Sequence, residues 1–248
     1  MGLLHPGEMG SALGAALRER AHAVVWASEG RSEATAARAR AADLDDVGTA
    51  DDVARRSDVL LSVCPPHAAA DVARSVTGFA GIYVDANAIA PGTTHAIAEM
   101  FEQFVDGGVI GPPPLSRGTT RLYLSGPQAP RVADLFTGTT VDARILSDAI
   151  GDASALKMAY ASWTKGTAAL LLAVRGVASA LGIAEPLLAE WAESLPELPD
   201  QSVRAAESAA AKGWRWVGEM EEIAATFRAA GLPDGFHLAA AEIFHRKT

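Results

Sequence analysis

The sequence predicts an α/β fold, built as a doubly wound parallel sheet, followed by an all-α helical domain. Short apolar runs alternate with helical patterns over the first part of the chain, which is typical of strands and crossover helices in a parallel sheet. From about Asp148 the strand patterns stop, and Ala, Leu, Glu and Trp recur at helical spacing. We therefore predict two domains, residues 1–147 and residues 148–248.

Apolar runs bounded by turn residues predict the strands. They are residues 1–4, 22–27, 59–64, 81–86, 104–110 and 121–124, with a short strand also expected at 47–48. Helical spacing predicts helices at 11–20, 32–42, from 51 or 52, at 67–76 and at 91–103. A long helix over 152–181 should open the second domain, which prolines and glycines divide into four or five helices.

The composition excludes several classes of function. No apolar run approaches the ~20 residues of a membrane span, and residues 1–4 lack the basic flank of a signal peptide. The single Cys64 excludes an intrachain disulfide and fits a reducing compartment. A net charge of −9 without a basic cluster argues against nucleic acid, and no residues have metal-ligand spacing. We expect a cytoplasmic protein that binds a small molecule and no metal.

The first turn of the chain has the pattern of a phosphate cradle. A strand, a tight turn and a helix N-terminus place backbone N–H groups and the helix dipole against a dinucleotide pyrophosphate. The candidate residues are His5, Pro6, Gly7, Glu8, Met9 and Gly10. In the fingerprint G-x-G-x-x-G the three glycine positions are here His5, Gly7 and Gly10, so the first glycine is missing. Taken alone, the pattern fits nucleotide binding and a plain strand–turn–helix corner equally well.

The end of the second strand favours NADP over NAD. An NAD site carries an acidic residue there that binds the ribose 2′-hydroxyl, and Trp26-Ala27-Ser28 offers none. Ser28, Arg31 and Ser32 supply hydroxyls and a guanidinium that suit a 2′-phosphate. The alternative is an ordinary solvated loop that contains an arginine.

Two further strand ends lie where open α/β sheets bind ligands. Cys64 and Pro65 follow one strand, and Asn87 follows the next. Asn87 could donate to a nicotinamide amide or to a substrate oxygen, and an ordinary strand-to-helix turn accounts for it equally well. Cys64 is most simply a small buried apolar residue and not a nucleophile.

The segment from Asp106 to Pro114 predicts one edge of a site. The glycines Gly107, Gly108 and Gly111 would let a ligand approach the backbone, and the following prolines would form a rigid wall. Glycine–proline runs are also common in loops without a function.

Lys157 is the candidate proton carrier, because it interrupts an apolar stretch of the long helix. Half-buried beside a cofactor, a lysine of lowered pKa can exchange a proton with a substrate oxygen or nitrogen. Helical spacing places Tyr160 on the same face, whereas Lys165 falls off that stripe and is expected to be a surface charge.

The helical domain offers carboxylates and a histidine. Glu219 and Glu222 share one helix face and are candidates to reach a cleft, while Met220 and Ile223 are expected in the core. His237 is more simply a packed or capping residue than a catalytic one.

Together these residues resemble the β-hydroxyacid dehydrogenase superfamily, which includes 3-hydroxyisobutyrate dehydrogenase, the NAD-binding domain of 6-phosphogluconate dehydrogenase and the imine reductases. The similarity covers nearly the whole chain. The turn from Gly7 to Gly10 matches the family's glycine turn, residues 106–113 match its substrate-binding segment, and Lys157 matches its catalytic lysine. The chain departs from the family at Ile110, where a serine holds a carboxylate, at Ala161, where an asparagine is expected, and at Glu221-Glu222, where the family has a Lys-Asp pair.

The resemblance implies a Rossmann-type domain, a nicotinamide cofactor and a homodimer formed through the helical domain. It implies hydride transfer between the nicotinamide and a C–O or C–N centre, with Lys157 as general acid or base and Asn87 as an orienting partner. The predicted substrate contacts are Gly107, Gly108, Ile110, Gly111, Tyr160, Glu219 and Glu222. Because of the departures, a catalytically inactive NADP-binding or sensing protein is the alternative.

Overall fold

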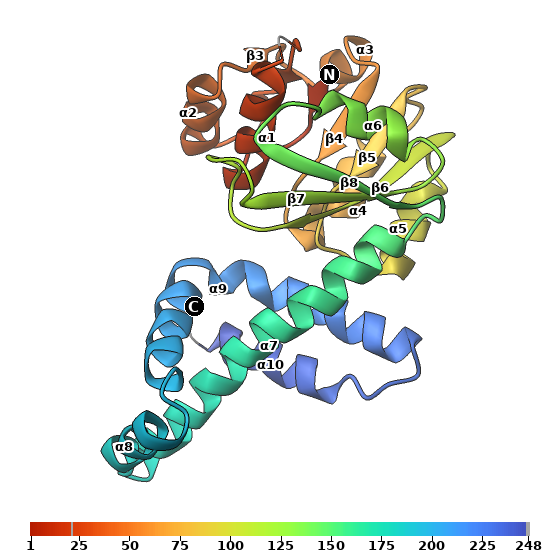
Figure 1. The fold of residues 1–248 in the computed structure, drawn as a ribbon. Coiled ribbons are helices and arrows are strands. Elements are labelled where there is room, and N and C mark those ends of the chain that lie inside the picture. Colours follow the sequence, from red (N-terminus) through yellow and green to blue (C-terminus); the bar gives the residue numbers. More distant parts are fainter. Residues whose placement is uncertain (21, 247–248) are drawn as a thin grey trace. The chain divides into compact units, whose positions relative to one another are not determined.

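The first part of the chain forms an eight-stranded sheet in the order β3-β2-β1-β4-β5-β6-β7-β8 (Figure 1). The computed structural model describes residues 1–20 and 22–246. The strands are β1 (Gly2–Leu3), β2 (Val25–Trp26), β3 (Asp45–Asp46), β4 (Val59–Ser62), β5 (Ile82–Asp85), β6 (Gln103–Ile110), β7 (Thr120–Ser125) and β8 (Val141–Ser147). The chain winds outward from β1 to β3 and then returns to the other side of β1, so the strand order reverses between β1 and β4. In open α/β sheets, ligands bind in a crevice at the carboxyl ends of the strands at such a point.

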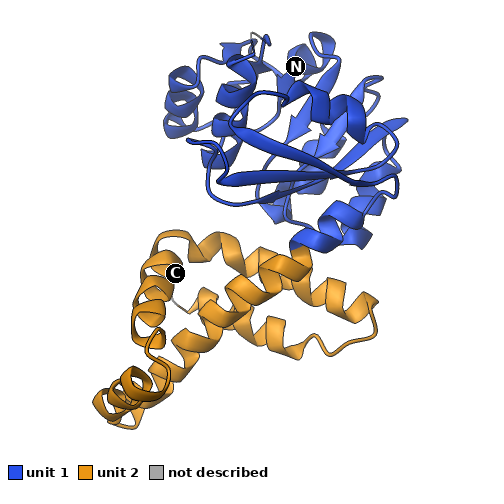
Figure 2. Ribbon diagram, in the orientation of Figure 1, with its two compact units in different colours: residues 1–157 blue, residues 158–248 orange. Residues whose placement is uncertain are grey.

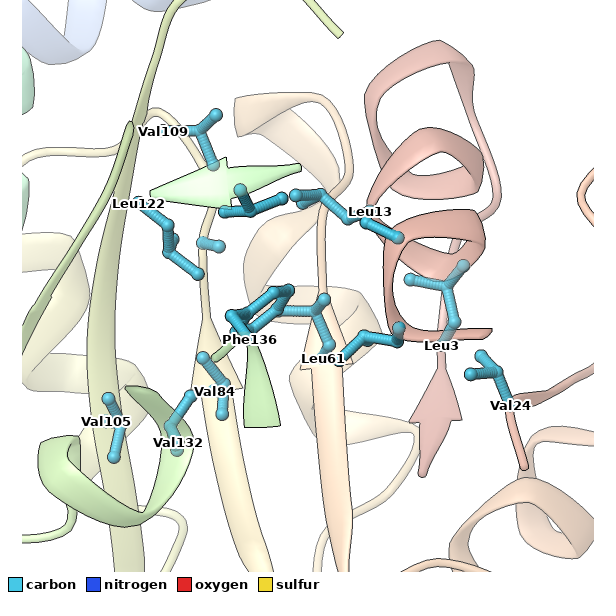
Figure 3. Packing of buried hydrophobic residues seen from close by; sticks show 14 of the residues in the cluster. Leu3, Leu13, Val24, Leu61, Val84, Val105, Val109, Leu122, Val132 and Phe136 are labelled. Atoms are coloured by element: carbon cyan, nitrogen blue, oxygen red, sulfur yellow. The ribbon is translucent and has the colours of Figure 1, made fainter. Parts of the chain in front are cut away.

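Helices cover both faces of this sheet. They are α1 (Glu8–Arg18), α2 (Glu33–Ala41), α3 (Ala50–Arg55), the 3₁₀ helix η1 (Pro66–Ala68), α4 (Ala69–Arg74), α5 (Pro91–Ala98) and α6 (Ala129–Leu135). One buried cluster joins α1, α2 and α6 to one face, and Figure 3 shows Leu13, Leu61 and Phe136 within it. A second buried cluster joins α3, α4 and α5 to the other face. The doubly wound prediction is therefore confirmed.

The prediction of an all-parallel sheet is wrong at one pair. β6 and β7 run antiparallel, and the other neighbouring pairs are parallel. A loop over residues 111–119 joins β6 to β7, and such a loop is too short for a crossover to a parallel strand. The helix α6 and the edge strand β8 were not predicted, and the short strand expected at 47–48 lies at Asp45–Asp46.

Four helices make up the rest of the described chain. They are α7 (Asp152–Ala180), α8 (Ala184–Ser194), α9 (Leu198–Ala229) and α10 (Gly235–His245). The predicted core positions Met220 and Ile223 on α9 are fully buried. By contacts the chain divides into two compact units, residues 1–157 and 158–248 (Figure 2), so the division lies inside α7 and not at 147.

Within the described ranges, no helix combines the length and the apolar character that crossing a membrane requires.

Candidate functional site

The turn after β1 is closed by His5, Pro6 and Gly7. The Gly7 N–H donates to His5 O at 2.8 Å, so the chain reverses within three residues and α1 begins at Glu8 without a side-chain cap. Gly10 is required here, because a Cβ at this position would lie 2.3 Å from His5 O. The predicted residues Glu8, Met9 and Gly10 form the first turn of α1. The first N–H groups of α1, which no side chain caps, thus follow the carboxyl end of β1 after a short turn. An anion-binding site at a helix N-terminus requires such uncapped N–H groups.

Arg31 crosses onto this turn from the loop after β2. Its Nη1 lies 2.9 Å from His5 Nδ1, and its Nη2 donates to Leu4 O at 2.9 Å. Burial, followed by the charges of Arg31 and Arg38, lowers the pKa of His5 to about 4. His5 is therefore neutral at pH 7, and because its Nδ1 accepts from the guanidinium, its hydrogen is on Nε2.

The structure separates the residues predicted to hold a 2′-phosphate. The Ser28 N–H donates to Asp46 Oδ1 at 3.2 Å. Burial opposes the ionisation of Asp46, but hydrogen bonds from Ser28 and Gly48 outweigh it and lower its pKa. Ser32 caps α2 by accepting from the Thr35 N–H at 3.3 Å. Ser28 therefore lies beside an anion, and the Ser32 hydroxyl is used by a helix end.

Arg38 is a further cation near this turn, and the sequence did not predict a role for it. It lies on α2, one and a half turns beyond Ser32, and its Nη2 donates to Thr35 Oγ1 at 3.2 Å. Among residues 1–20 and 22–246, no carboxylate forms an ion pair with Arg31 or Arg38. The sequence contained one sign of this cation: Arg38 lies on the helix that Ser32 was expected to cap.

Asn87 links the ends of β4 and β5 through hydrogen bonds of its side chain. Its Oδ1 accepts from the Cys64 N–H at 2.6 Å, and its Nδ2 donates to Ser62 Oγ at 3.1 Å and to Asp85 Oδ2 at 3.0 Å. With both amide hydrogens used and 2% of the residue exposed, the predicted donation from Asn87 to a ligand has no support in this geometry. The residue instead closes a turn between a strand and a helix, which is the alternative that its sequence context allows.

Cys64 is a buried thiol at the same strand end. Burial and the nearby Asp85 carboxylate raise its pKa to about 12, which agrees with its interpretation as a small packed residue. Pro65 precedes η1 and accepts from the Ala68 N–H at 2.9 Å.

Lys157 lies beside an extension of β6. β5 pairs with β6 as far as Asp106, opposite Asp85, and residues 107–110 continue past the end of β5 beside β7. The Lys157 Nζ donates to Val109 O, 2.7 Å away in this extension. The ammonium group is thus held at the carboxyl edge of the sheet, where open α/β sheets bind ligands.

The glycines of this segment serve packing and backbone conformation. A Cβ at Gly108 would lie 2.6 Å from Ala153 O, because α7 packs directly on β6 there. Gly107 faces the end of β5. Gly111 has φ +123°, and a Cβ would lie 2.2 Å from Thr119 O. Packing therefore explains the glycine at 108, and backbone conformation explains the glycine at 111. The predicted approach of a ligand to their backbone stays a prediction.

The side chain of Ile110, which was predicted to contact the substrate, is buried at the end of β6. It is 4% exposed, and its contact with a substrate stays a prediction. The proline loop that follows is held by Thr120 Oγ1, which donates to Pro112 O at 2.5 Å, and it leaves Leu115 87% exposed at its tip.

A buried row of polar side chains crosses the sheet at its carboxyl edge. Ser62 pairs in register with Asp85, Asp85 with Asp106, and Asp106 with Ser125, so their side chains lie side by side. All four are essentially unexposed. Because unpaired polar groups are costly inside a protein, this row must be satisfied by whatever packs on it.

Asp106 satisfies its part of the row by anchoring α7. It accepts from Gly151 N at 3.1 Å, from Ser154 N at 2.9 Å, from Ser154 Oγ at 2.6 Å and from Ser125 Oγ at 3.0 Å. Burial raises its pKa, against the opposing effect of these hydrogen bonds. From the sequence, Asp106 was expected only to begin the segment at the edge of the site. The signal was a polar residue at the same depth in four consecutive apolar strands.

One of the two carboxylates that were predicted to contact the substrate already has an ion-pair partner within the helical unit. Glu219 on α9 forms an ion pair with Lys165 on α7, and both side chains are mostly buried. The prediction that Lys165 is a surface charge is therefore wrong. Tyr160 is 46% exposed on α7, Glu222 lies on α9, and His237 packs between the rings of Phe227 and Phe236. The described residues contain no group of three or more His, Cys, Asp or Glu side chains that could hold a metal.

Comparisons with known proteins agree with this architecture. Residues 178–247 match the family model of a domain of unknown function, DUF1932. An uncharacterized 28.5 kDa protein of Methanothermus fervidus is 31% identical over 191 residues, which is 76% of this chain and 74% of that protein.

Solved structures share the fold over nearly the whole chain. A conserved protein of unknown function, described as structurally similar to 3-hydroxyacid dehydrogenases, matches 99% of this chain and 95% of its own, with a TM-score of 0.71 and 29% identity. A Mycobacterium tuberculosis 3-hydroxyisobutyrate dehydrogenase, solved with L-serine, matches 99% of this chain and 92% of its own, with a TM-score of 0.71 and 16% identity.

Proposed function

Because this chain belongs to the β-hydroxyacid dehydrogenase superfamily, with a C-terminal helical domain, we propose that it is an NAD(P)-dependent oxidoreductase. It transfers hydride between the nicotinamide and a C–O or C–N centre of a small substrate, and the nicotinamide supplies or accepts that hydride. The observation that carries the proposal is the placement of Lys157, with its Nζ bonded to Val109 O at the carboxyl edge of the sheet.

The nucleotide end of the crevice fits such a cofactor. The N-terminus of α1 has no side-chain cap, Gly10 allows the turn to pack against it, and the guanidinium of Arg31 lies on the end of β1. A dinucleotide pyrophosphate is an anion that these groups can bind.

Lys157 supports proton transfer by its fixed position. An ammonium group carries three hydrogens, and Val109 O accepts one of them, which orients the group. In a reduction the ammonium donates a proton to the substrate oxygen or nitrogen, and in the reverse reaction the neutral amine accepts it.

The preference for NADP rests on Arg38. It is a cation on α2 without a carboxylate partner among the described residues, and Thr35 holds its Nη2 at 3.2 Å. A guanidinium suits a 2′-phosphate. Asp46, which accepts from the Ser28 N–H, is the group that would favour NAD instead.

Titration with NADPH and NADH, followed by quenching of the tryptophan fluorescence, tests the cofactor. The proposal expects binding of both with a preference for NADPH, and binding of neither would refute it. A Lys157→Met variant should keep the affinity for the cofactor and lose most of the turnover on carbonyl and imine substrates.

The inactive NADP-binding protein is the second candidate, because Ile110 is buried and both amide hydrogens of Asn87 are used inside the fold. It predicts tight cofactor binding with no turnover that Lys157→Met could remove. Hydride exchange between NADPH and a screen of ketones and imines separates the two functions.

We also propose that the protein is a homodimer formed through α7. Three apolar residues at a spacing of seven lie on this helix, Trp163, Leu170 and Val177, and they are 75%, 51% and 59% exposed in the single chain. A seven-residue apolar repeat is the pattern of paired helices, and a second copy would cover it. Light scattering should give twice the mass of 25.7 kDa, and a Leu170→Glu variant should give the monomer.

A further inference from the structure

The missing first glycine and the unusual path of Arg31 belong to one arrangement. We propose that Arg31, held in place by His5, binds the pyrophosphate of the dinucleotide, the part that NAD and NADP share. This inference rests on the proposed function. It assigns to Arg31 a different partner from the 2′-phosphate that the sequence predicts.

The position of the guanidinium supports the pyrophosphate. Leu4, whose carbonyl accepts from Arg31 Nη2, directly follows β1, and its N–H donates to Leu61 O of β4 at 3.1 Å. The positive charge therefore lies over the junction of β1 and β4. In the Rossmann arrangement the pyrophosphate crosses the sheet at this junction, beside the N-terminus of the first helix. The 2′-hydroxyl group binds beyond the end of β2, and the loop that follows β2 leads into α2, the helix that carries Arg38.

The electrostatics of Arg31 point to an anion. Its two contacts are neutral acceptors, His5 Nδ1 and Leu4 O, and its Nε is buried without a hydrogen-bond partner in the described part of the chain. Arg18 of the same unit, by contrast, has the Asp43 carboxylate beside it. A partly buried cation without an opposite charge is unfavourable, and a diphosphate would provide the missing acceptors.

His5 has a role that glycine cannot fill. Its neutral imidazole accepts from the guanidinium and fixes the end of a long, flexible side chain. Glycine at this position would leave Arg31 anchored by Leu4 O alone. His5 is thus a positioning residue for Arg31, and the change from glycine to histidine replaces a contact made by the backbone with one made by a side chain.

The test compares dissociation constants for NADPH and NADH. We expect Arg31→Met to weaken both cofactors by a similar factor of about 10 to 100, the range for losing a charged hydrogen bond. Arg38→Met should weaken NADPH alone. Arg40→Met is the matched control, because Arg40 lies on the same helix, is exposed and pairs with Glu33, and it should change neither constant.

His5 variants test the positioning role. His5→Gly should weaken NADPH and NADH alike, by less than Arg31→Met, and His5→Asn, which keeps an acceptor, should recover part of the loss. Loss of NADPH affinity alone in Arg31→Met would show that Arg31 binds the 2′-phosphate and would overturn the inference, as would no loss at all. Failure of the unaltered protein to bind either cofactor would instead refute the proposed function.

A measurement on the unaltered protein covers the case in which Arg31→Met does not fold. The imidazole resonances of His5 should shift when ADP is added, since ADP carries a diphosphate and no 2′-phosphate. Adenosine 2′-monophosphate should shift them much less. Equal shifts, or a shift with the 2′-phosphate alone, would overturn the inference.

Discussion

Gly108→Ala is the change that tests most directly how Lys157 is positioned. The added Cβ would lie 2.6 Å from Ala153 O and 3.2 Å from Lys157 Cβ. Both neighbours belong to the first turns of α7, and one is a backbone atom that cannot rotate away. We therefore expect α7 to be pushed off β6.

The size of the effect follows from these distances. A carbon–oxygen contact relaxes at about 3.3 Å, so the helix start must move by roughly 0.7 Å. The same helix start is held by Ser154 N to Asp106 at 2.9 Å and Ala153 N to Ser125 at 3.0 Å, and such a shift stretches these bonds toward their limit. Overpacking costs about 1–3 kcal/mol and the weakened bonds about 1 kcal/mol. We expect a loss of about 2–4 kcal/mol.

Thermal unfolding followed by circular dichroism measures this loss. For a unit of this size it corresponds to a fall in Tm of roughly 5–15 °C. Gly92→Ala is the control, because a Cβ there meets nothing within 4 Å, and it should be as stable as the parent or slightly more so. If Gly108→Ala unfolds at the same temperature as Gly92→Ala, α7 is not packed on β6 as described.

Three further predictions concern other buried groups. The pKa of His5 is lowered to about 4, so the unfolded chain binds a proton at this residue more tightly than the folded chain does. The free energy of unfolding should therefore fall as the pH drops from about 6.5 to 4. Urea unfolding should show a fall that is about 2 kcal/mol larger in the parent than in His5→Asn. Cys64, with its pKa raised to about 12, should resist a thiol reagent at pH 8 in the folded protein and react once urea unfolds it. Lys165→Met should cost about 3 kcal/mol, since Glu219 is left buried and unpaired, and adding Glu219→Leu should recover most of that loss in the same unfolding assay.

The sequence predicts the fold well where hydrophobic spacing alone decides it. The long helix is expected to end at residue 181 and ends at Ala180, and the cap at Ser32 accepts from Thr35 as expected. β8 was missed although its first five residues, Val141 to Ile145, alternate apolar and polar side chains as a half-buried strand does. The antiparallel direction of β7 could have been predicted, because the strands expected at 104–110 and 121–124 leave only residues 111–120 between them, and a crossover to a parallel strand needs about a dozen or more.

The site is harder to predict, because a polar residue at the end of a strand can either bind a ligand or close the turn to the next helix. Asn87 has the same sequence context whether it binds a ligand or closes a turn. The register that sets Ser62 opposite Asp85 decides between them, and a single sequence does not contain that register. Lys157 could be found because a charged side chain in an apolar stretch of helix must either reach water or serve a site.

The polar row explains why Asn87, a predicted ligand contact, is used inside the fold. Its four members lie in register on four neighbouring strands, and each needs a partner once buried. On one side Asn87 provides it and joins β4 to β5. On the other side the start of α7 provides it through Ser154 and Gly151, which fixes the register of the helix on β6. Lys157 follows Ser154 by three residues, so the same hydrogen bonds that satisfy Asp106 also set where the ammonium lies. The row therefore holds the site in place, and the groups that contact ligands must be sought beyond it, at Lys157 and on the first turn of the chain.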